Sequence, residues 1–388
     1  MDTLTENRVE KFFKKLRSPF KVLDTLFKII LIALILLMLF ESFSFLLYKS
    51  YKSNKPSEGL IIDILNNNSW VRDYIKEDNS FGNEYTPYLG WKRIPNFHGV
   101  YVNVDNESMR KTDNPCSSKD SIRIFVFGGS TTWGSGVQDN STFPSYLSKY
   151  LCQIGISNEI KNFGEGAYVN TQEMIRLQLE LRKGNIPDIV IFYDGANDAA
   201  STYQNNLSGW HHNVFDRQAD FNSRKRLNIL QFALDSYSMK VLNRVAMMFG
   251  IHKKTRGYTG EQLENDTISV YSNNLQIINT LSREYNFKVF YYWHPTISSK
   301  LVLSEDEKNK ISKDQVFEGF YQNITKKVRK LNLTEFYDIS TIFNKYNNTI
   351  FIDDCHVFEQ GNEIIAKRIS EDVINYVTSN LVKFNKSL

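Results

Sequence analysis

The sequence predicts a three-layer α/β/α fold, in which a five-stranded, mainly parallel sheet lies between two layers of helices. Two observations predict this body. Short apolar segments alternate with helical segments from residue 121 onward, and residues 189–193 form an unbroken apolar run of the kind buried on both faces of a parallel sheet. A third observation, an apolar stretch at residues 26–48, predicts one N-terminal transmembrane helix before this body.

The N-terminal segment has the length and composition of a membrane anchor. Residues 29–40 are all apolar, and the stretch 26–48 exceeds the about 20 residues that cross a bilayer core, with Glu41 as its one carboxylate. A buried amphipathic helix and a cleaved signal peptide are the alternatives. No small-x-small cleavage site follows the run, which favours an uncleaved anchor.

Basic residues flank this span unequally, and the excess on its N-terminal side predicts the orientation. We therefore expect residues 1–25 to be cytoplasmic and the body to lie in the periplasm or outside the cell. The N-terminal cations are Arg8, Lys11, Lys14, Lys15, Arg17, Lys21 and Lys28, and those soon after the span are Lys49, Lys52 and Lys55.

A tether and an aromatic-rich lead-in, together residues 49–118, separate the anchor from the body at 119–388. Residues 49–58 are polar and end near Pro56, which is typical of a short tether. In the lead-in, the segments 88–93 and 98–104 predict short strands. We expect the lead-in to pack against the body and not to form a separate catalytic domain.

The body is predicted to alternate strands with helices. Apolar and β-branched runs predict strands at 122–127, 159–163, 188–193, 287–292 and 335–338, and helical periodicity predicts helices at 143–152, 171–182, 262–285, 316–331 and 361–382. In the last of these helices, Ile365, Ile369, Val373 and Val377 recur every fourth residue and predict one buried face.

A long insertion at about 199–260 interrupts this alternation. It contains Trp210, His211 and His212, the basic run 224–226 and an apolar stretch at 241–249. Three interpretations remain open from the sequence. It is a helical excursion packed on the body, a cap that shapes the substrate pocket, or a surface that lies on the membrane.

Functional side chains follow the predicted strands directly. Ser130 lies in the run Gly128-Gly-Ser-Thr-Thr-Trp-Gly134, a tight turn that lifts a hydroxyl clear of the sheet edge. Ala167 and Asn197 follow the next two strands, so all three residues should meet at the carboxyl edge of the sheet. His294 follows the fourth strand and could approach the same edge, with a structural role as the alternative.

An acid and a histidine occur together near the C-terminus, in Asp353-Asp-Cys-His356. A serine hydroxyl is a weak nucleophile and needs a base within hydrogen-bond reach, which an imidazole with a pKa near 6.5 can provide. Ser130, His356 and an aspartate are therefore the parts needed for nucleophilic acyl transfer.

The chain resembles the SGNH or GDSL-type hydrolase family through four blocks in order. These are Gly128–Gly134, Asn162-Phe-Gly-Glu-Gly-Ala-Tyr168, Gly195-Ala-Asn-Asp198 and Asp353–His356. The resemblance covers roughly residue 121 to the C-terminus and implies a flavodoxin-like three-layer fold. It also implies that Ser130 is the nucleophile, that His356 is the base and that Asp353, not Asp354, orients the imidazole.

The same resemblance implies an oxyanion hole formed by the Ser130 N–H, the Asn197 side-chain amide and a backbone N–H of the second block. In that block Ala167 occupies the position where the family has glycine, with Gly166 one step before it. A backbone donor does not require glycine, provided that φ is negative there. A second departure is Gly129, which stands where the family name has aspartate.

Composition excludes several other functions. The net charge is only +4 and no long basic run occurs, so nucleic-acid binding has little support. No metal-ligand constellation and no glycine-rich phosphate loop is found, so we expect no metal and no cofactor.

The chain has three cysteines, so they cannot all pair with one another. Cys116 and Cys355 could form a disulfide, which would leave Cys152 unpaired. The alternative is three free thiols.

The sequence therefore predicts a membrane-anchored serine esterase that removes O-acyl groups, with acetyl as the expected group, from carbohydrate outside the cytoplasm. A lipid ester is a second possible substrate. One alternative is an O-acetyltransferase that acts with partners in polysaccharide assembly. The other is an inactive glycan-binding or scaffold subunit with the same fold.

Overall fold

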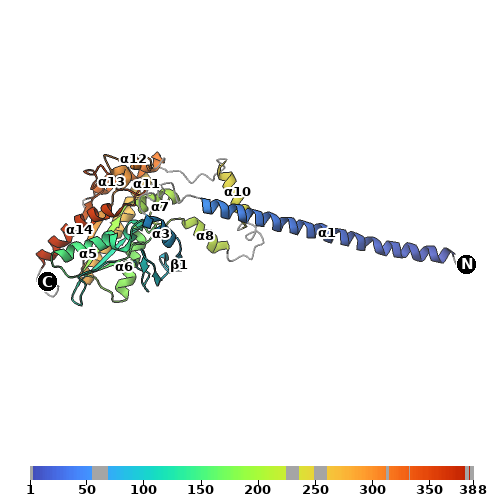
Figure 1. Cartoon of the computed structure of the whole chain (residues 1–388), viewed down its shortest axis with the longest axis horizontal. Coiled ribbons are helices and arrows are strands. Elements are labelled where there is room, and N and C mark those ends of the chain that lie inside the picture. The colour runs from blue at the N-terminus through green and yellow to red at the C-terminus, as the bar shows by residue number, and fades with distance from the viewer. Residues whose placement is uncertain are drawn as a thin grey trace. The chain divides into compact units, whose positions relative to one another are not determined.

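The computed structural model describes residues 3–54, 69–223, 236–248, 260–311, 314–331, 333–380 and 384. The chain divides into two compact units (Figure 1). One unit comprises Met1–Pro56 and Ala219–Lys253, and the other comprises Ser57–Gln218 and Lys254–Leu388. The tether residues 55–58, the basic run 224–226 and the end of the last predicted helix lie outside the described residues.

The first unit contains two described helices, α1 (Thr3–Asn54) and α10 (Tyr237–Met248). Within α1, the segment Val22–Ser50 has a mean hydropathy of 2.7 and is long and apolar enough to cross a membrane. Helix α10 belongs to the predicted insertion. At its start, the N–H groups of Tyr237 and Ser238 donate hydrogen bonds to the two carboxylate oxygens of Glu41, the second over 3.1 Å.

The second unit is built on a five-stranded sheet with the order β6-β5-β7-β8-β9, in which every neighbouring pair is parallel. The prediction of a three-layer α/β body is therefore confirmed. All five strands were predicted from the sequence, and their bounds are β5 (Ile122–Gly128), β6 (Asn158–Asn162), β7 (Ile189–Asp194), β8 (Lys288–Trp293) and β9 (Phe336–Asp338).

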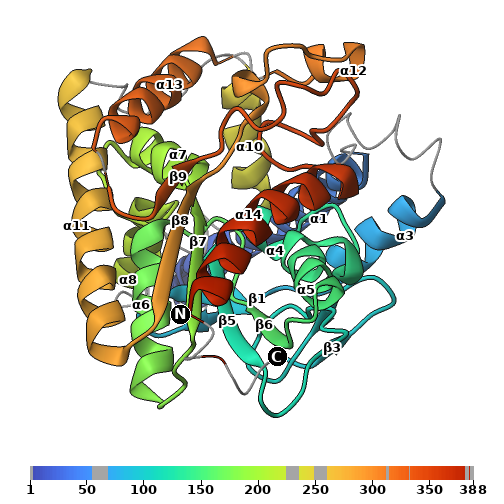
Figure 2. The same cartoon turned by 90° about the vertical axis from the view of Figure 1, so that its left-hand side faces the viewer.

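Helices cover both faces of this sheet because alternate strand residues point to opposite sides (Figure 2). Ile124 and Ile191 pack with α5 (Phe143–Gln153) and α14 (Glu359–Ser379) in one buried cluster. Phe125 and Phe192 pack in a second cluster on the other face, with α6 (Asn170–Arg182), α11 (Glu261–Tyr285) and α13 (Gln315–Arg329). The predicted buried face of the last helix is correct, since its four apolar residues are at most 1% exposed.

The lead-in packs against this body through two hairpins and one helix. The hairpins are β1 (Asn83–Thr86) with β2 (Gly90–Arg93), and β3 (Phe97–His98) with β4 (Asn103–Val104), so short strands form as predicted. Helix α3 (Ser69–Asp78) was not predicted. The Trp91 indole N–H donates to the Gly166 carbonyl over 2.9 Å and ties the lead-in to the second block.

The short helices α4 (Ser130–Trp133), α7 (Ala196–Asn205), α8 (Val214–Ser223) and α12 (Glu305–Lys308) complete the described elements that carry the argument below. Helices α4 and α7 follow β5 and β7 directly, separated from each strand by one residue, so each begins at the carboxyl edge of the sheet.

The disulfide prediction was wrong in its pairing. The bridge joins Cys116 to Cys152, whose Cα atoms lie 5.6 Å apart, and Cys355 is free. Cys116 lies just before β5 and Cys152 lies near the end of α5. After β5 the chain runs through α5, whose end lies beside the segment that precedes β5. The sequence positions of the cysteines did not reveal this chain path.

Candidate active site

Ser130 begins helix α4 immediately beyond β5, at the carboxyl edge of the sheet. The two glycines before it leave room for close backbone approaches. A Cβ atom at Gly128 would lie 2.8 Å from the Tyr193 carbonyl oxygen, and one at Gly129 would lie 2.1 Å from the Asn197 amide nitrogen. The glycine pair therefore lets the turn press against β7 and the start of α7.

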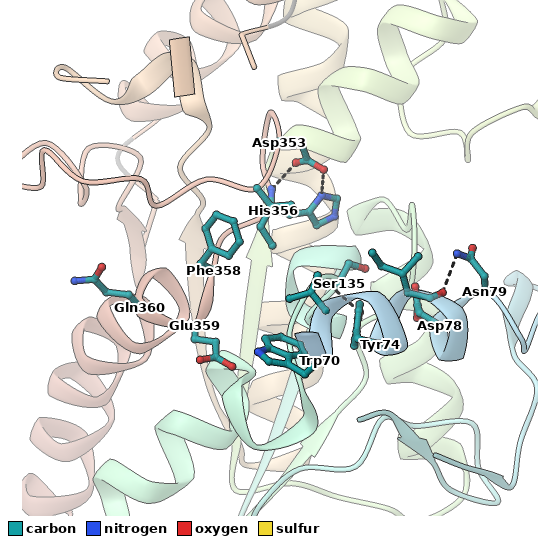
Figure 3. Close-up of a pocket in the computed structure, with 14 residues that line it drawn as sticks. Trp70, Tyr74, Asp78, Asn79, Ser135, Asp353, His356, Phe358, Glu359 and Gln360 are labelled. Atoms are coloured by element: carbon teal, nitrogen blue, oxygen red, sulfur yellow. Dashed lines mark hydrogen bonds and ion pairs between the residues drawn. The ribbon is translucent and has the colours of Figure 1, made fainter. Parts of the chain in front are cut away.

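The distant C-terminal block meets Ser130 at this edge. His356 Nε2 lies 2.7 Å from Ser130 Oγ. On the other side of the ring, His356 Nδ1 lies 2.7 Å from Asp353 Oδ2 (Figure 3). The other Asp353 oxygen accepts the N–H groups of Cys355 and His356, over 3.0 and 2.8 Å. The arrangement can pass the hydroxyl proton of Ser130 to an imidazole whose tautomer is held by the carboxylate.

The local charges suit this arrangement. Burial raises the pKa of Asp353, but its hydrogen bonds with His356 and the backbone lower it to about 2, so the carboxylate stays ionised. Burial lowers the pKa of His356, but Cys355 and the Asp353 hydrogen bond together raise it well above 6.5. The imidazolium that forms during proton transfer is therefore stabilised at this position.

Asp353, Cys355 and His356 also offer carboxylate, thiol and imidazole atoms within 4.8 Å of one another, a set that could hold a metal ion. A metal on His356 Nδ1 would replace the hydrogen bond to Asp353. Proton transfer uses the same two groups without breaking that contact and explains the geometry better.

The predicted oxyanion donors come together beside Ser130. Asn197 lies in the first turn of α7, and its Nδ2 donates one hydrogen bond to the Tyr168 carbonyl over 2.9 Å, which leaves a second N–H. Within the described chain, the structure records no protein acceptor for the backbone N–H of Ser130 or Ala167. By contrast, the Gly166 N–H donates to Glu165 Oε1 over 2.9 Å. Of the two second-block candidates, Ala167 is therefore the one with a donor to spare.

The condition of a negative φ at Ala167 is not met, because φ there is +62°. This is the left-handed region, which costs a residue with a Cβ atom about 1–2 kcal/mol. Glycine adopts this conformation without that cost, which explains why a glycine stands at this position in the family pattern.

His294 reaches the site through the third block. Its Nε2 accepts the N–H of Ala196 over 3.1 Å, and its Nδ1 lies 2.8 Å from the Pro295 carbonyl. These partners require the neutral tautomer protonated at Nδ1. Burial lowers the pKa of His294 to about 4, so the ring stays neutral.

A cavity of about 520 Å³ opens beside His356 and Asp353 (Figure 3). Five of its fourteen lining residues come from helix α3, including Trp70, Tyr74 and Asp78, and Asn79 follows directly after it. Sequence reasoning missed this wall, although the aromatic content of the lead-in was a signal for it. The lead-in thus takes part in the site as well as packing against the body.

Comparison with known proteins identifies the family of this chain. Residues 124–369 match the family model described as GDSL-like Lipase/Acylhydrolase. Because the match covers more than half of the chain, the protein belongs to this family of serine hydrolases, which act on ester bonds. A search of curated proteins found no match.

Several solved structures are similar in part, each aligned over 64–65% of this chain. An acetyl xylan esterase, AlAXEase, is 16% identical and is covered over 100% of its own chain, with a TM-score of 0.37. A member of the lipolytic G-D-S-L family from Veillonella parvula DSM 2008 is 11% identical over 97% of its chain, and the lipase Lip_vut3 from a goat rumen metagenome is 12% identical over 96%, both with TM-scores of 0.37. Scores this low carry no information about substrate.

Proposed function

We propose that this hydrolase is a membrane-anchored esterase that removes O-acyl groups, with acetyl as the expected group, from carbohydrate outside the cytoplasm. The observation that carries the proposed mechanism is the distance of 2.7 Å between Ser130 Oγ and His356 Nε2. Ser130, His356 and Asp353 form the proposed triad, and Asn197 and the N–H groups of Ser130 and Ala167 form the proposed oxyanion hole.

In this mechanism, Ser130 Oγ attacks the ester carbonyl carbon while His356 Nε2 takes the hydroxyl proton. The negative oxygen of the tetrahedral intermediate accepts hydrogen bonds from the three donors. The intermediate collapses, the sugar oxygen leaves with the proton from His356, and the acyl group remains on Ser130. Water then attacks the acyl-enzyme by the same route and releases the carboxylic acid and free Ser130.

The proposed location rests on helix α1 and on the flanking charge. The apolar side chains of Val22–Ser50 point outward, and the cations predominate before this segment, which supports a cytoplasmic N-terminus. The Cys116–Cys152 bridge supports an oxidising compartment for the hydrolase unit. A reporter fused after Leu388 that is active only in the cytoplasm would contradict this orientation.

The mechanism is tested with the full-length chain in detergent. We expect it to hydrolyse p-nitrophenyl acetate and to be labelled by a fluorophosphonate probe. Ser130→Ala should abolish both signals, whereas Ser118→Ala, in the loop before β5, should keep them. Hydrolysis that persists in Ser130→Ala, or a folded wild type that takes no label, contradicts the proposed mechanism. Product analysis with an acetylated glycan then separates transfer to water from transfer to another sugar.

A further inference from the structure

The wall of the cavity opposite His356 belongs to helix α3, and two hydrogen-bonded anchors hold that helix in position. The Glu77 carboxylate accepts the backbone N–H groups of Val100, Tyr101 and Val102 over 2.7–2.8 Å. The Tyr74 hydroxyl accepts the N–H of Gly136, on the loop that follows Ser130, over 2.8 Å. Helix α3 is therefore fixed both to the rest of the lead-in and to the loop that follows Ser130, as the wall of a binding site must be.

Trp70 provides an aromatic surface in this wall. Its ring is half-buried and packs with the rings of Tyr74 and Tyr101, with ring centroids 6.1 and 5.9 Å away. The same indole lines the cavity, as does Phe358 near the start of α14 (Figure 3). An aromatic ring that is packed against its neighbours and lines a cavity suits the C–H face of a sugar ring as well as it suits a hydrocarbon chain.

The polar groups of the cavity favour a sugar over a hydrocarbon chain as its ligand. Asp78 lines the cavity and is partly exposed, and its carboxylate has no recorded hydrogen bond or ion pair with any described residue. Asn79, Glu359 and Gln360 add further hydrogen-bonding groups to the lining. A hydrocarbon chain packed there would displace water from the Asp78 carboxylate without giving it a hydrogen bond, which is costly. A hydroxyl, amide N–H or ammonium group of a sugar would donate to it.

The charge of the lining narrows the sugar class. Asp78, Asp353 and Glu359 are acidic, and none of the fourteen lining residues is lysine or arginine. Lys310 lies 5.5 Å from the Phe358 ring centroid, but it donates to the Phe351 carbonyl and is not part of the lining. His356 is the one lining residue that can carry a positive charge, and it is already paired with Asp353. A uronic acid in this cavity would therefore meet the Asp78 and Glu359 carboxylates without a lysine or arginine to balance them.

We propose that the α3 wall is a glycosyl subsite, in which a neutral or amino sugar of the acylated substrate stacks on Trp70 and donates a hydrogen bond to Asp78. This inference rests on the proposed function, since it names the carbohydrate class that the esterase takes. The sugar bound there is the unit next to the ester, because the cavity also reaches His356.

The test uses full-length protein in detergent and a panel of acetylated oligosaccharides that are neutral, amino-sugar or uronate in type, with p-nitrophenyl acetate and p-nitrophenyl decanoate as sugar-free esters. We expect kcat/KM for the neutral or amino-sugar members to exceed that for the uronates. Trp70→Ala should raise KM for the preferred glycan about tenfold, with kcat little changed. Its kcat/KM for p-nitrophenyl acetate should fall much less than its kcat/KM for the glycan, because that ester has no sugar ring to stack. Trp70→Phe, which keeps a ring, should recover much of the loss.

Asp78→Ala, which removes the acceptor, should raise KM for the same glycan, and Asp73→Ala is its matched control. Asp73 lies on the same helix but is exposed and pairs with Lys76 over 2.9 Å. Three outcomes overturn the inference. The first is an equal loss of kcat/KM on all esters in both Trp70→Ala and Trp70→Phe. The second is a loss confined to the decanoate, which would identify an acyl-chain pocket, and the third is faster turnover of the uronates than of the other glycans. Failure of the proposed function itself differs from all three, because no ester would then be turned over and Ser130 would take no fluorophosphonate.

Discussion

His294 Nε2 accepts a hydrogen bond from the backbone N–H of Ala196, one residue before the proposed oxyanion donor Asn197. The histidine follows β8 and the alanine follows β7, so the contact joins the ends of two neighbouring strands at the edge where Ser130 lies. A buried, neutral imidazole thereby holds the first turn of α7.

His294→Ala should lower kcat about tenfold with little change in KM for a small ester, because the Ala196 N–H loses its acceptor and Asn197 loses its fixed position. His294→Gln, whose side-chain oxygen can accept the same N–H, should restore part of kcat. A loss of the same size in both variants, or a change in KM alone, would contradict a positioning role.

The same residue should affect stability against pH. The folded-state pKa of His294 is lowered to about 4 from 6.5, so the unfolded chain binds the extra proton first. The contribution of neutral His294 to the free energy of unfolding is complete above pH 6.5, and it is lost as the pH falls from 6.5 towards 4. The Tm, measured by thermal unfolding, should fall less between pH 6.5 and pH 4 for His294→Gln than for wild type.

The pH dependence of activity should reflect His356. The base must be neutral to accept the Ser130 proton, and its pKa is raised above 6.5, so kcat/KM for p-nitrophenyl acetate should rise with pH through a midpoint above 6.5. Asp353, with a pKa of about 2, stays ionised throughout this range. Cys355→Ser should move the midpoint to lower pH, because Cys355 contributes to the raised pKa of His356. An unmoved midpoint would exclude that contribution.

Gly129 and Asn197 should behave as one unit. A Cβ at position 129 would lie 2.1 Å from the Asn197 amide nitrogen, so Gly129→Ala should displace that amide. We expect kcat to fall about 10²–10³-fold, as for loss of one oxyanion donor and as in Asn197→Ala. The double variant should be little worse than either single one. Gly319→Ala in α13, where an added Cβ meets open space, is the control. Fully additive losses of kcat in the double variant would contradict the view that the two residues act as one unit.

Glu41 should hold helix α10 to helix α1. Its carboxylate accepts the first N–H groups of α10, and the rings of Phe45 and Tyr237 pack with centroids 4.9 Å apart. Loss of a helix cap costs about 0.5–2 kcal/mol, so Glu41→Ala should speed limited trypsin cleavage after Lys240 severalfold in detergent-solubilised protein. Glu41→Gln keeps an acceptor oxygen and should be closer to wild type. Unchanged cleavage in Glu41→Ala would show that the contact contributes little.

Much of the fold could be predicted because its signals are local. The apolar runs that became β5 and β7 are continuous, and the spacing of Ile365, Ile369, Val373 and Val377 marks one helix face directly. Helix α3 was missed because it is short and is anchored by contacts distant in sequence, such as those of Glu77 and Tyr74. The partner of Cys116 was also a matter of chain path, which the spacing of three cysteines does not determine.

For the site, the sequence predicted that Ser130, Asn197 and His356 would meet at the carboxyl edge of the sheet, and their catalytic roles remain predictions. By itself, the sequence determined the class of fold, the apolar N-terminal helix and the family, because these depend on residue type and on order along the chain. Tertiary structure alone decided that Ala167 lies at positive φ, that Gly166 has no free donor, that His294 supports the third block and that α3 walls the cavity. Each of these depends on which backbone groups are already paired, and pairing between distant segments exists only once the chain has folded.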